Sequence, residues 1–235
     1  YASSTTSVPL LGSDLSQTST DWGDSDAIRD QIQLSRINGV VKENGTGSTV
    51  NSVAGFDVGW GIWAGGRDFA SSGITDVFAQ ESTTPDYWLS AKPIDKDLMP
   101  VTGEILFNDV LGFQGASTND GAFNALTAAI NVNFGTGGLT GNIMATTTNN
   151  NIVWDVGVAG SINGHVNGVS NASTAVLSPT SLTVGGSSIP SFAGDMTGIF
   201  VGTSSPNAFA TGFNIHDFTN GNKIAGTALI GILPE

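Results

Sequence analysis

The sequence contains no cysteine, few charged residues and no long apolar run, and each absence excludes a class of protein. Without cysteine, neither a disulfide framework nor a thiolate metal site can form. No segment approaches the ~20 consecutive apolar residues that a membrane helix requires. The first residues lack the basic and hydrophobic regions of a signal peptide and begin with Tyr1, so we expect a mature product or a portion of a longer protein.

Charged residues make up only 11% of the chain, against about a quarter in an average soluble domain. Seven basic residues stand against 20 acidic ones, a formal charge of −13. Such a surface repels phosphate backbones and anionic lipid heads, so we expect neither nucleic acid nor a membrane surface as a partner. We also expect no insertion as an outer-membrane barrel, because the five Trp and two Tyr are scattered singly and form no aromatic girdles.

Short strands separated by turn residues fill the chain from about residue 56 onward. The clearest hairpin joins residues 126–134 to residues 139–146 through a tight Gly-rich turn. Eight or nine such segments at roughly even spacing, with almost no helical periodicity, indicate a closed barrel or a sandwich. Glycines inside the strands favour the barrel, because sheet closure needs tight bends. We therefore predict an all-β fold, an eight-stranded antiparallel up-and-down barrel with an extended N-terminal arm.

The stretch from residue 194 to residue 231 carries the strongest local signal, a meander of three apolar runs at 197–202, 209–215 and 224–230. In the second run Phe209, Phe213 and Ile215 share one face, whereas Ala210, Gly212, Asn214 and His216 share the other, as in a half-buried strand. Asn220-Gly221 suits a type I′ turn, because both central residues of that turn need a positive φ.

The length of 235 residues fits one large all-β domain or two small ones. We divide the chain into an arm or linker over residues 1–54 and a barrel domain over residues 55–235. The first twenty residues are rich in Ser and Thr and cannot fold alone, yet Val8, Leu10 and Leu11 form an apolar patch. We expect this patch to pack on the chain's own barrel or on the sheet of a neighbouring copy. The residues near position 30 suit either a short helix or a strand.

The residues that most often carry catalysis are few. The two histidines are His165, beside an Asn-Gly turn, and His216, which directly precedes Asp217. The His216 and Asp217 pair either helps to hold a metal or is a pair of exposed loop residues. No G-x-S-x-G motif occurs, so a Ser-His-acid triad would have to use one of these histidines without a local nucleophile signature. We expect no enzyme, no cofactor, and no catalytic or metal-binding residue.

Acidic and aromatic residues also form groups in the sequence. The N-terminal acidic cluster resembles a cation loop but lacks the D-x-D-x-D spacing and the glycine of a calcium loop; it comprises Asp21, Asp24 and Asp26. We expect the remaining acid groupings to be solvated loop acids: Asp95, Asp97 and Glu104, and Asp109 with Asp120. Four tryptophans lie on expected strands and either pack in the core and rim or offer an exposed ring to a carbohydrate or haem-like ligand: Trp60, Trp63, Trp88 and Trp154.

Several motifs over residues 56–232 resemble the C-terminal barrel of large FecR-type bacterial surface proteins. They are, in order, WGIW (60–63), YWLSAKP with MPVTGEILFN, AAINVNFGTGGLTGNI, TGIFVGTSSPNAFATGFNI and NKIAGTALIG. The most specific is G-x-F-x-G-x-x-x-x-x-A-x-x-x-G-F followed by I-A-G-T-A, here Gly198 to Phe213 and Ile224 to Ala228. More distantly, the motifs are similar to the barrel of transferrin-binding protein B. The resemblance implies an eight-stranded barrel, but Ile62 replaces a common Arg and no binding residue carries over.

These observations predict a non-enzymatic bacterial module, located outside the cell or on its surface. The main interpretation is a structural subunit of a surface assembly or fibre, whose N-terminal arm docks on a neighbouring copy to build a homo-oligomer. The alternative is a receptor module of the transferrin-binding protein type, which captures a host protein or a nutrient ligand. A hydrolase is the third interpretation.

Overall fold

The structure is a computed structural model that describes residues 10–12, 40–42, 58–64, 86–166, 169 and 173–233. In these ranges the regular elements are β-strands, apart from one short 3-10 turn, η1 (Lys96–Leu98). The predicted all-β class is therefore confirmed. No helix among the described residues has the length and apolar composition to cross a membrane.

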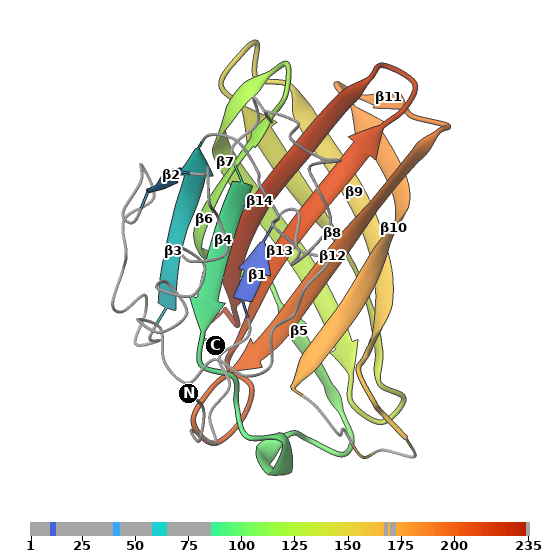
Figure 1. Ribbon diagram of the computed structural model, residues 1–235. Coiled ribbons are helices and arrows are strands. Elements are labelled where there is room, and N and C mark those ends of the chain that lie inside the picture. Colours follow the sequence, from blue (N-terminus) through green and yellow to red (C-terminus); the bar gives the residue numbers. More distant parts are fainter. Residues whose placement is uncertain are drawn as a thin grey trace, which may run out of the picture.

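Eight antiparallel strands close a barrel in which each strand pairs with the next and β14 pairs back to β6 (Figure 1). Their bounds are β6 (Asp109–Ser117), β7 (Gly121–Asn133), β8 (Gly138–Thr147), β9 (Val153–Ile162), β10 (Thr174–Val184), β12 (Phe192–Val201), β13 (Ala208–Asp217) and β14 (Asn222–Gly231). Two short strands extend this sheet, β5 (Glu104–Phe107) beside β7 and β11 (Ser187–Ser188) beside β10. The predicted eight-stranded up-and-down barrel is confirmed.

The predicted hairpin is the pair β7 and β8, and the predicted meander is β12, β13 and β14. The prediction of a type I′ turn between β13 and β14 is wrong. Asp217 and Asn222 are the last paired residues, so the loop holds four residues instead of two, and Gly221 adopts a positive φ of 64° while Asn220 does not. The buried Asp217 carboxylate stabilises this longer loop by accepting hydrogen bonds from the backbone N–H groups of Thr219 and Asn220.

A second, four-stranded sheet lies against the outer wall of the barrel (Figure 1). Its order is β1 (Leu10–Gly12), β4 (Asp86–Ala91), β3 (Val58–Ala64) and β2 (Val40–Lys42). The prediction that the segments of β3 and β4 belong to the barrel is wrong. These strands pair with each other over six residue pairs, and the barrel closes without them. The predicted boundary between residues 54 and 55 lies outside the described residues, as do the segment near residue 30 and Val8.

Part of the N-terminal arm, strand β1, pairs within its own chain. Leu10 and Leu11 belong to β1, which adds to the edge of β4 and contacts β13 and β14 of the barrel. The backbone of β1 therefore docks on its own chain, as one of the two predicted arrangements requires. The burial of the apolar side chains stays a prediction. Docking on a neighbouring copy stays a prediction.

Side chains fill the interior of the barrel. Phe200 lies at the centre of an aromatic cluster, with ring centroids 6.0 Å from Phe107, 5.6 Å from Phe134 and 5.2 Å from Phe209. These four rings are fully buried, as is Trp154 nearer the other end. Aromatic pairs at such distances contribute about 0.5–1.5 kcal/mol beyond the area that they bury. The barrel is therefore a packed core and not a pore.

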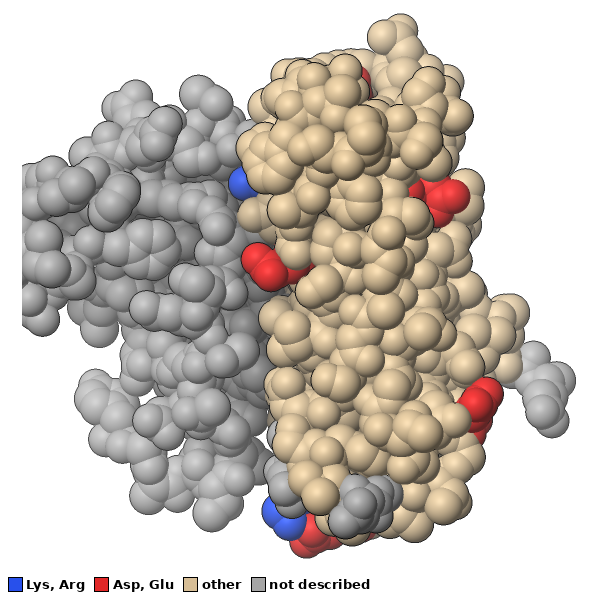
Figure 2. All heavy atoms as spheres, turned by 90° about the vertical axis from the view of Figure 1, so that its right-hand side faces the viewer, with Lys and Arg blue, Asp and Glu red and all other residues tan. Residues whose placement is uncertain are grey.

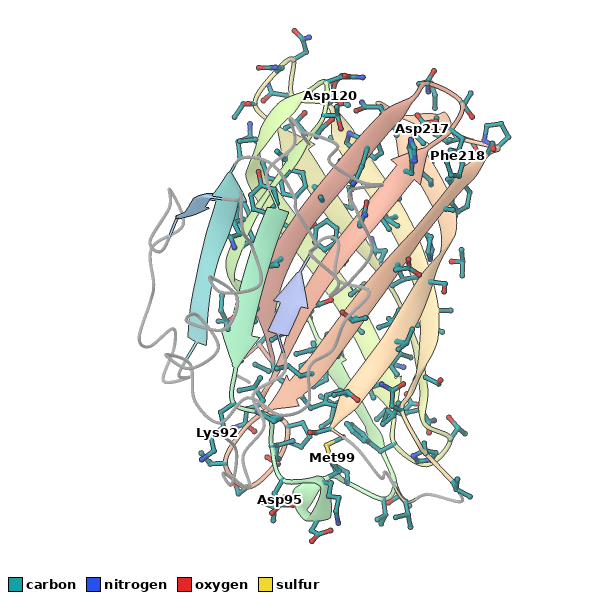
Figure 3. The ribbon with its side chains drawn as sticks, in the orientation of Figure 1. Lys92, Asp95, Met99, Asp120, Asp217 and Phe218 are labelled. Atoms are coloured by element: carbon teal, nitrogen blue, oxygen red, sulfur yellow. The ribbon has the colours of Figure 1, made fainter. Side chains whose placement is uncertain are left out.

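The connection between β4 and β5 crosses the lower end of the barrel in the view of Figure 1. Ile94 and Met99 from this connection pack into the barrel core. The backbone N–H of Ile94 donates to the carbonyl oxygen of Phe200 at 2.9 Å. Figure 3 shows the labelled Lys92, Asp95 and Met99 around this end. The connection therefore plugs the barrel mouth and fixes β4 to β12.

The second sheet packs on the barrel through an apolar seam, which consists of Leu89, Ala91, Ile199, Val201, Ala208, Ala210 and Leu229. The inner face predicted for β13 is confirmed, since Phe209, Phe213 and Ile215 lie in the barrel core. The outer face is not polar throughout. Ala210 points outward but is buried, because the second sheet covers this part of the wall. The seam thus joins the two sheets.

The seam strand β4 also carries a titrating group. Burial raises the pKa of the Tyr87 hydroxyl from 10.0 to about 12. Because the folded chain holds this proton more tightly than the unfolded chain, the associated stability is complete below about pH 10 and falls as the pH rises towards about 12. We expect urea midpoints to fall over this interval, and to fall less in Tyr87→Phe. An equal fall in both proteins would contradict the burial of an ionisable phenol at this seam.

Candidate functional site

The two histidines lie on different parts of the barrel, His165 in the connection after β9 and His216 on β13. The Nε2 atom of His165 lies 3.3 Å from the carbonyl oxygen of Gly135, and the His216 ring centroid lies 4.3 Å from that of Phe218. Asp217 alternates with His216 across β13 and turns its buried carboxylate to the hairpin loop. In the part of the chain that the structure describes, no three His, Asp or Glu side chains gather as a metal-binding group.

The acidic residues that the sequence grouped together have separate local partners in the structure. Asp95 caps η1 by accepting a hydrogen bond from the backbone N–H of Asp97, and Asp97 pairs with Lys96 on the exposed surface. Glu104 accepts hydrogen bonds from the side-chain amides of two β7 residues, Asn131 and Asn133. Asp109 begins β6 and Asp120 lies in the turn after it, so about 26 Å of strand separates the two residues. The N-terminal cluster of Asp21, Asp24 and Asp26 lies outside the described residues.

Asp120 instead anchors a polar network at the upper end of the barrel. Its Oδ2 atom accepts hydrogen bonds from Ser117 Oγ and Asn222 Nδ2, each at 2.8 Å, and from Trp154 Nε1 at 3.3 Å. The network ties the turn after β6 to β9 and β14. The expected packing of Trp154 in the core is confirmed, while the side chains of the other three strand tryptophans lie outside the described residues. We interpret this network as structural, because all three hydrogen bonds that the Asp120 carboxylate accepts come from side chains of the barrel strands.

Replacing Asp120 by alanine should lower the free energy of unfolding by about 2 kcal/mol, because three donors lose a charged acceptor. Asp120→Asn should lower it less, since one side-chain oxygen remains. Asp195→Ala, at an exposed position on β12, is the matched control and should stay within about 0.5 kcal/mol of wild type. Urea unfolding followed by intrinsic tryptophan fluorescence measures all three, and equal midpoints for the two alanine variants would contradict the role of the network.

The lower end of the barrel carries most of the exposed apolar side chains. Of the ten large apolar residues that are exposed in the described chain, six lie in segments at this end. They are Leu98, Val101, Val166, Val169, Ile232 and Leu233, which we call the lower rim. Hydrogen bonds hold neighbouring segments at this end, from Phe134 N to the Gly103 oxygen and from Ile162 N to the Gly137 oxygen. The upper end offers Phe218 among the described residues (Figure 3).

The barrel wall carries very little charge. From residue 121 to residue 233 the charged side chains are Asp155, Asp195, Asp217 and Lys223. The face in Figure 2 is accordingly mostly uncharged, with a few isolated acidic positions and with basic residues at its left margin and its lower end. Charge therefore offers little specificity on this wall. The apolar lower rim is the stronger candidate for an interaction surface, and its members come from segments too far apart in the sequence for a local pattern to have revealed it.

No protein-family model and no curated protein sequence matches the chain. Among solved structures, the chain is similar to a double mutant of the vaccine antigen transferrin-binding protein B from Haemophilus parasuis, with a TM-score of 0.50 and 12% identity. That match covers 96% of this chain and 45% of the other, so this chain spans less than half the length of that protein. The N-lobe domain of lactoferrin-binding protein B from Moraxella bovis matches with a TM-score of 0.40 and 12% identity, over 94% of this chain and 91% of that domain.

At this identity, the match to transferrin-binding protein B shows similarity of fold alone. It supports the distant likeness that the motifs indicated. The match spans nearly the whole chain, so it takes in the four-stranded sheet as well as the barrel. The resemblance to FecR-type surface proteins stays a prediction.

Proposed function

We propose that this chain is a non-enzymatic binding module that holds another folded protein against the lower rim of its barrel. The observation that carries the proposal is the concentration of exposed apolar side chains at one end of a barrel whose interior is filled. Aromatic rings occupy the space that a small ligand would need. A partner therefore has to bind on the outside.

The lower rim has the properties of a protein-binding surface. Exposed apolar groups that gather on one region mark interaction sites, and the buried centre of an interface is more apolar than the rest of a protein surface. The rim residues lie outside the barrel strands, on loops or just after β14, and binding residues concentrate on such loops of a rigid scaffold in many folds. The negative charge of the whole chain favours a partner with basic groups around an apolar contact.

The similar structures suggest which partners to test first. They belong to proteins that are named for binding transferrin and lactoferrin, so these two proteins are the first probes. Transferrin-binding protein B is also described as a vaccine antigen, which supports a location outside the cell or on its surface for this chain. The receptor interpretation thus has more support than the fibre subunit that the sequence favoured. The proposal includes no catalytic role.

Binding to immobilised transferrin and lactoferrin tests the proposal. We expect wild-type protein to bind at least one of them, and Leu98→Asp combined with Val101→Asp to weaken that binding at least about tenfold, because a charge at an apolar contact must be desolvated. Met144→Asp is the control, since Met144 is also exposed but lies within β8, on the wall and away from the lower rim. The proposal fails if neither probe binds, or if the rim and wall variants bind equally.

A further inference from the structure

We propose that the edge of β4 that β1 occupies is an exchangeable strand-binding site, at which the N-terminal strand of one copy pairs with β4 of a second copy. The partner is therefore another copy of this chain. The proposal does not rest on the function of the lower rim, because β1 and the rim residues are different parts of the molecule.

The pairing of β1 with β4 is short. Three residue pairs hold it, with Leu10 opposite Ser90, Leu11 opposite Leu89 and Gly12 opposite Trp88. The other edge of β4 pairs with β3 over six residues, twice as many. Each hydrogen bond of such a ladder contributes only about 1 kcal/mol in water. Release of β1 therefore breaks a short ladder together with its contacts to β13 and β14, which β1 of a second copy would make again. Among the described strands no other occupies this edge of β4.

The acceptor strand keeps its place when β1 leaves. Leu89 and Ala91 of β4 are buried in the apolar seam against barrel strands β12, β13 and β14. Ile94, three residues after β4, is bonded to the carbonyl oxygen of Phe200. The strand is thus fixed on one face and at its end. Its free edge would present unpaired backbone N–H and C=O groups, which is the arrangement that accepts an added strand.

The donor strand can reach a second copy. Residues 13–39, 27 in number, separate β1 from β2 and span up to about 90 Å when extended. Residues 1–13 contain no charged side chain, so they approach a copy of net charge −13 without electrostatic repulsion of their own. When β1 of one copy pairs with β4 of a second copy, it makes the same contacts there that it makes on its own β4. The cost of this exchange is mainly the lost translational freedom of a second molecule, as in domain swapping.

Concentration decides between the two arrangements. A strand tethered to its own acceptor competes at an effective concentration on the order of millimolar. In dilute solution β1 therefore occupies its own β4, as the structure shows. On a crowded cell surface, or at about 1 mM in the tube, acceptors on other copies reach comparable concentration and exchange becomes substantial.

The absence of native cysteine allows a direct test by disulfide trapping. Copies with Leu10→Cys are mixed with copies with Ser90→Cys at about 1 mM and oxidised, the two carrying tags of different mass. Residues opposite each other in an antiparallel pair have Cα atoms about 4.5–5.5 Å apart, a distance that a disulfide can bridge. We expect covalent dimers of unlike copies in several-fold excess over a control mixture in which Thr140→Cys, exposed on β8, replaces Ser90→Cys.

A second variant tests the pairing within one chain. Leu10→Cys and Ser90→Cys together in one copy should close an internal disulfide at micromolar concentration and give few dimers. If this variant closes but the mixed copies give no more dimer than the Thr140→Cys control, β1 stays on its own sheet and the proposal is wrong. If the double variant forms no internal disulfide, the pairing of β1 with β4 is wrong, and the proposal is wrong as well.

Discussion

Replacing Phe200 by alanine lowers the free energy of unfolding by about 3–5 kcal/mol, the largest loss that we expect from a single substitution. The Phe200 ring is fully buried and contacts three other rings, from β5, the turn after β7, and β13. Its loss leaves a cavity at the point where the barrel wall meets the plug. Since small domains have only about 5–15 kcal/mol of net stability, this change removes a large share of it.

Guanidinium unfolding followed by far-ultraviolet circular dichroism measures the effect. Phe218→Ala is the matched control, because Phe218 has the same side chain but is 54% exposed in the loop after β13. We expect the control to change stability by no more than about 0.5 kcal/mol. Similar midpoints for the two variants would show that the barrel is not closed over a packed aromatic core.

Replacing Gly160 by alanine should cost about 3 kcal/mol, the upper end of what overpacking usually costs. A Cβ atom at this position of β9 would overlap the carbonyl oxygen of Val176 and lie 2.7 Å from the Cα atom of Leu177. Both obstacles are backbone atoms of β10, so no side-chain rotation relieves the overlap and the two strands have to separate. Strand glycines often mark such a close approach of another backbone.

Gly138→Ala provides the control for this prediction. Gly138 begins β8 without a positive φ, and a Cβ atom there would meet only the side-chain oxygen of Thr136, at 3.4 Å. We expect this variant to be as stable as wild type or slightly more stable, because alanine restricts the unfolded chain. Urea midpoints compare the two. A Gly160→Ala protein as stable as the Gly138→Ala protein would contradict the close pairing of β9 with β10.

The barrel could be predicted because its information is local. Alternating side chains such as Phe209, Phe213 and Ile215 specify a strand and its buried face without reference to any other strand. The sheet to which β4 belongs could not be predicted in this way. Leu89 and Ala91 also alternate, but they face the outside of the barrel, and a period of two does not say which sheet covers a strand. The error for β3 and β4 follows directly from that limit.

Neither the Asp120 network nor the lower rim could be predicted from the sequence, because both combine residues that are far apart along the chain. Asp120 and Asn222 are 102 residues apart, so only the closed barrel brings their side chains together. The lower rim likewise combines Leu98, Val166 and Ile232, whose exposure depends on how the strands end at one side of the barrel. By contrast, His216 and Asp217 are adjacent in sequence, and the strand places them on opposite faces.

The most direct test of the account is hydrogen–deuterium exchange of the chain alone and in complex with the probe that binds, transferrin or lactoferrin. If the lower rim is the contact surface, backbone amides in residues 92–103 and 163–166 and at residues 232 and 233 should exchange more slowly in the complex. Amides of β8 and β9 on the uncharged wall should be unchanged. Slower exchange on the wall with an unaffected rim, or no complex with either protein, would contradict the proposed function.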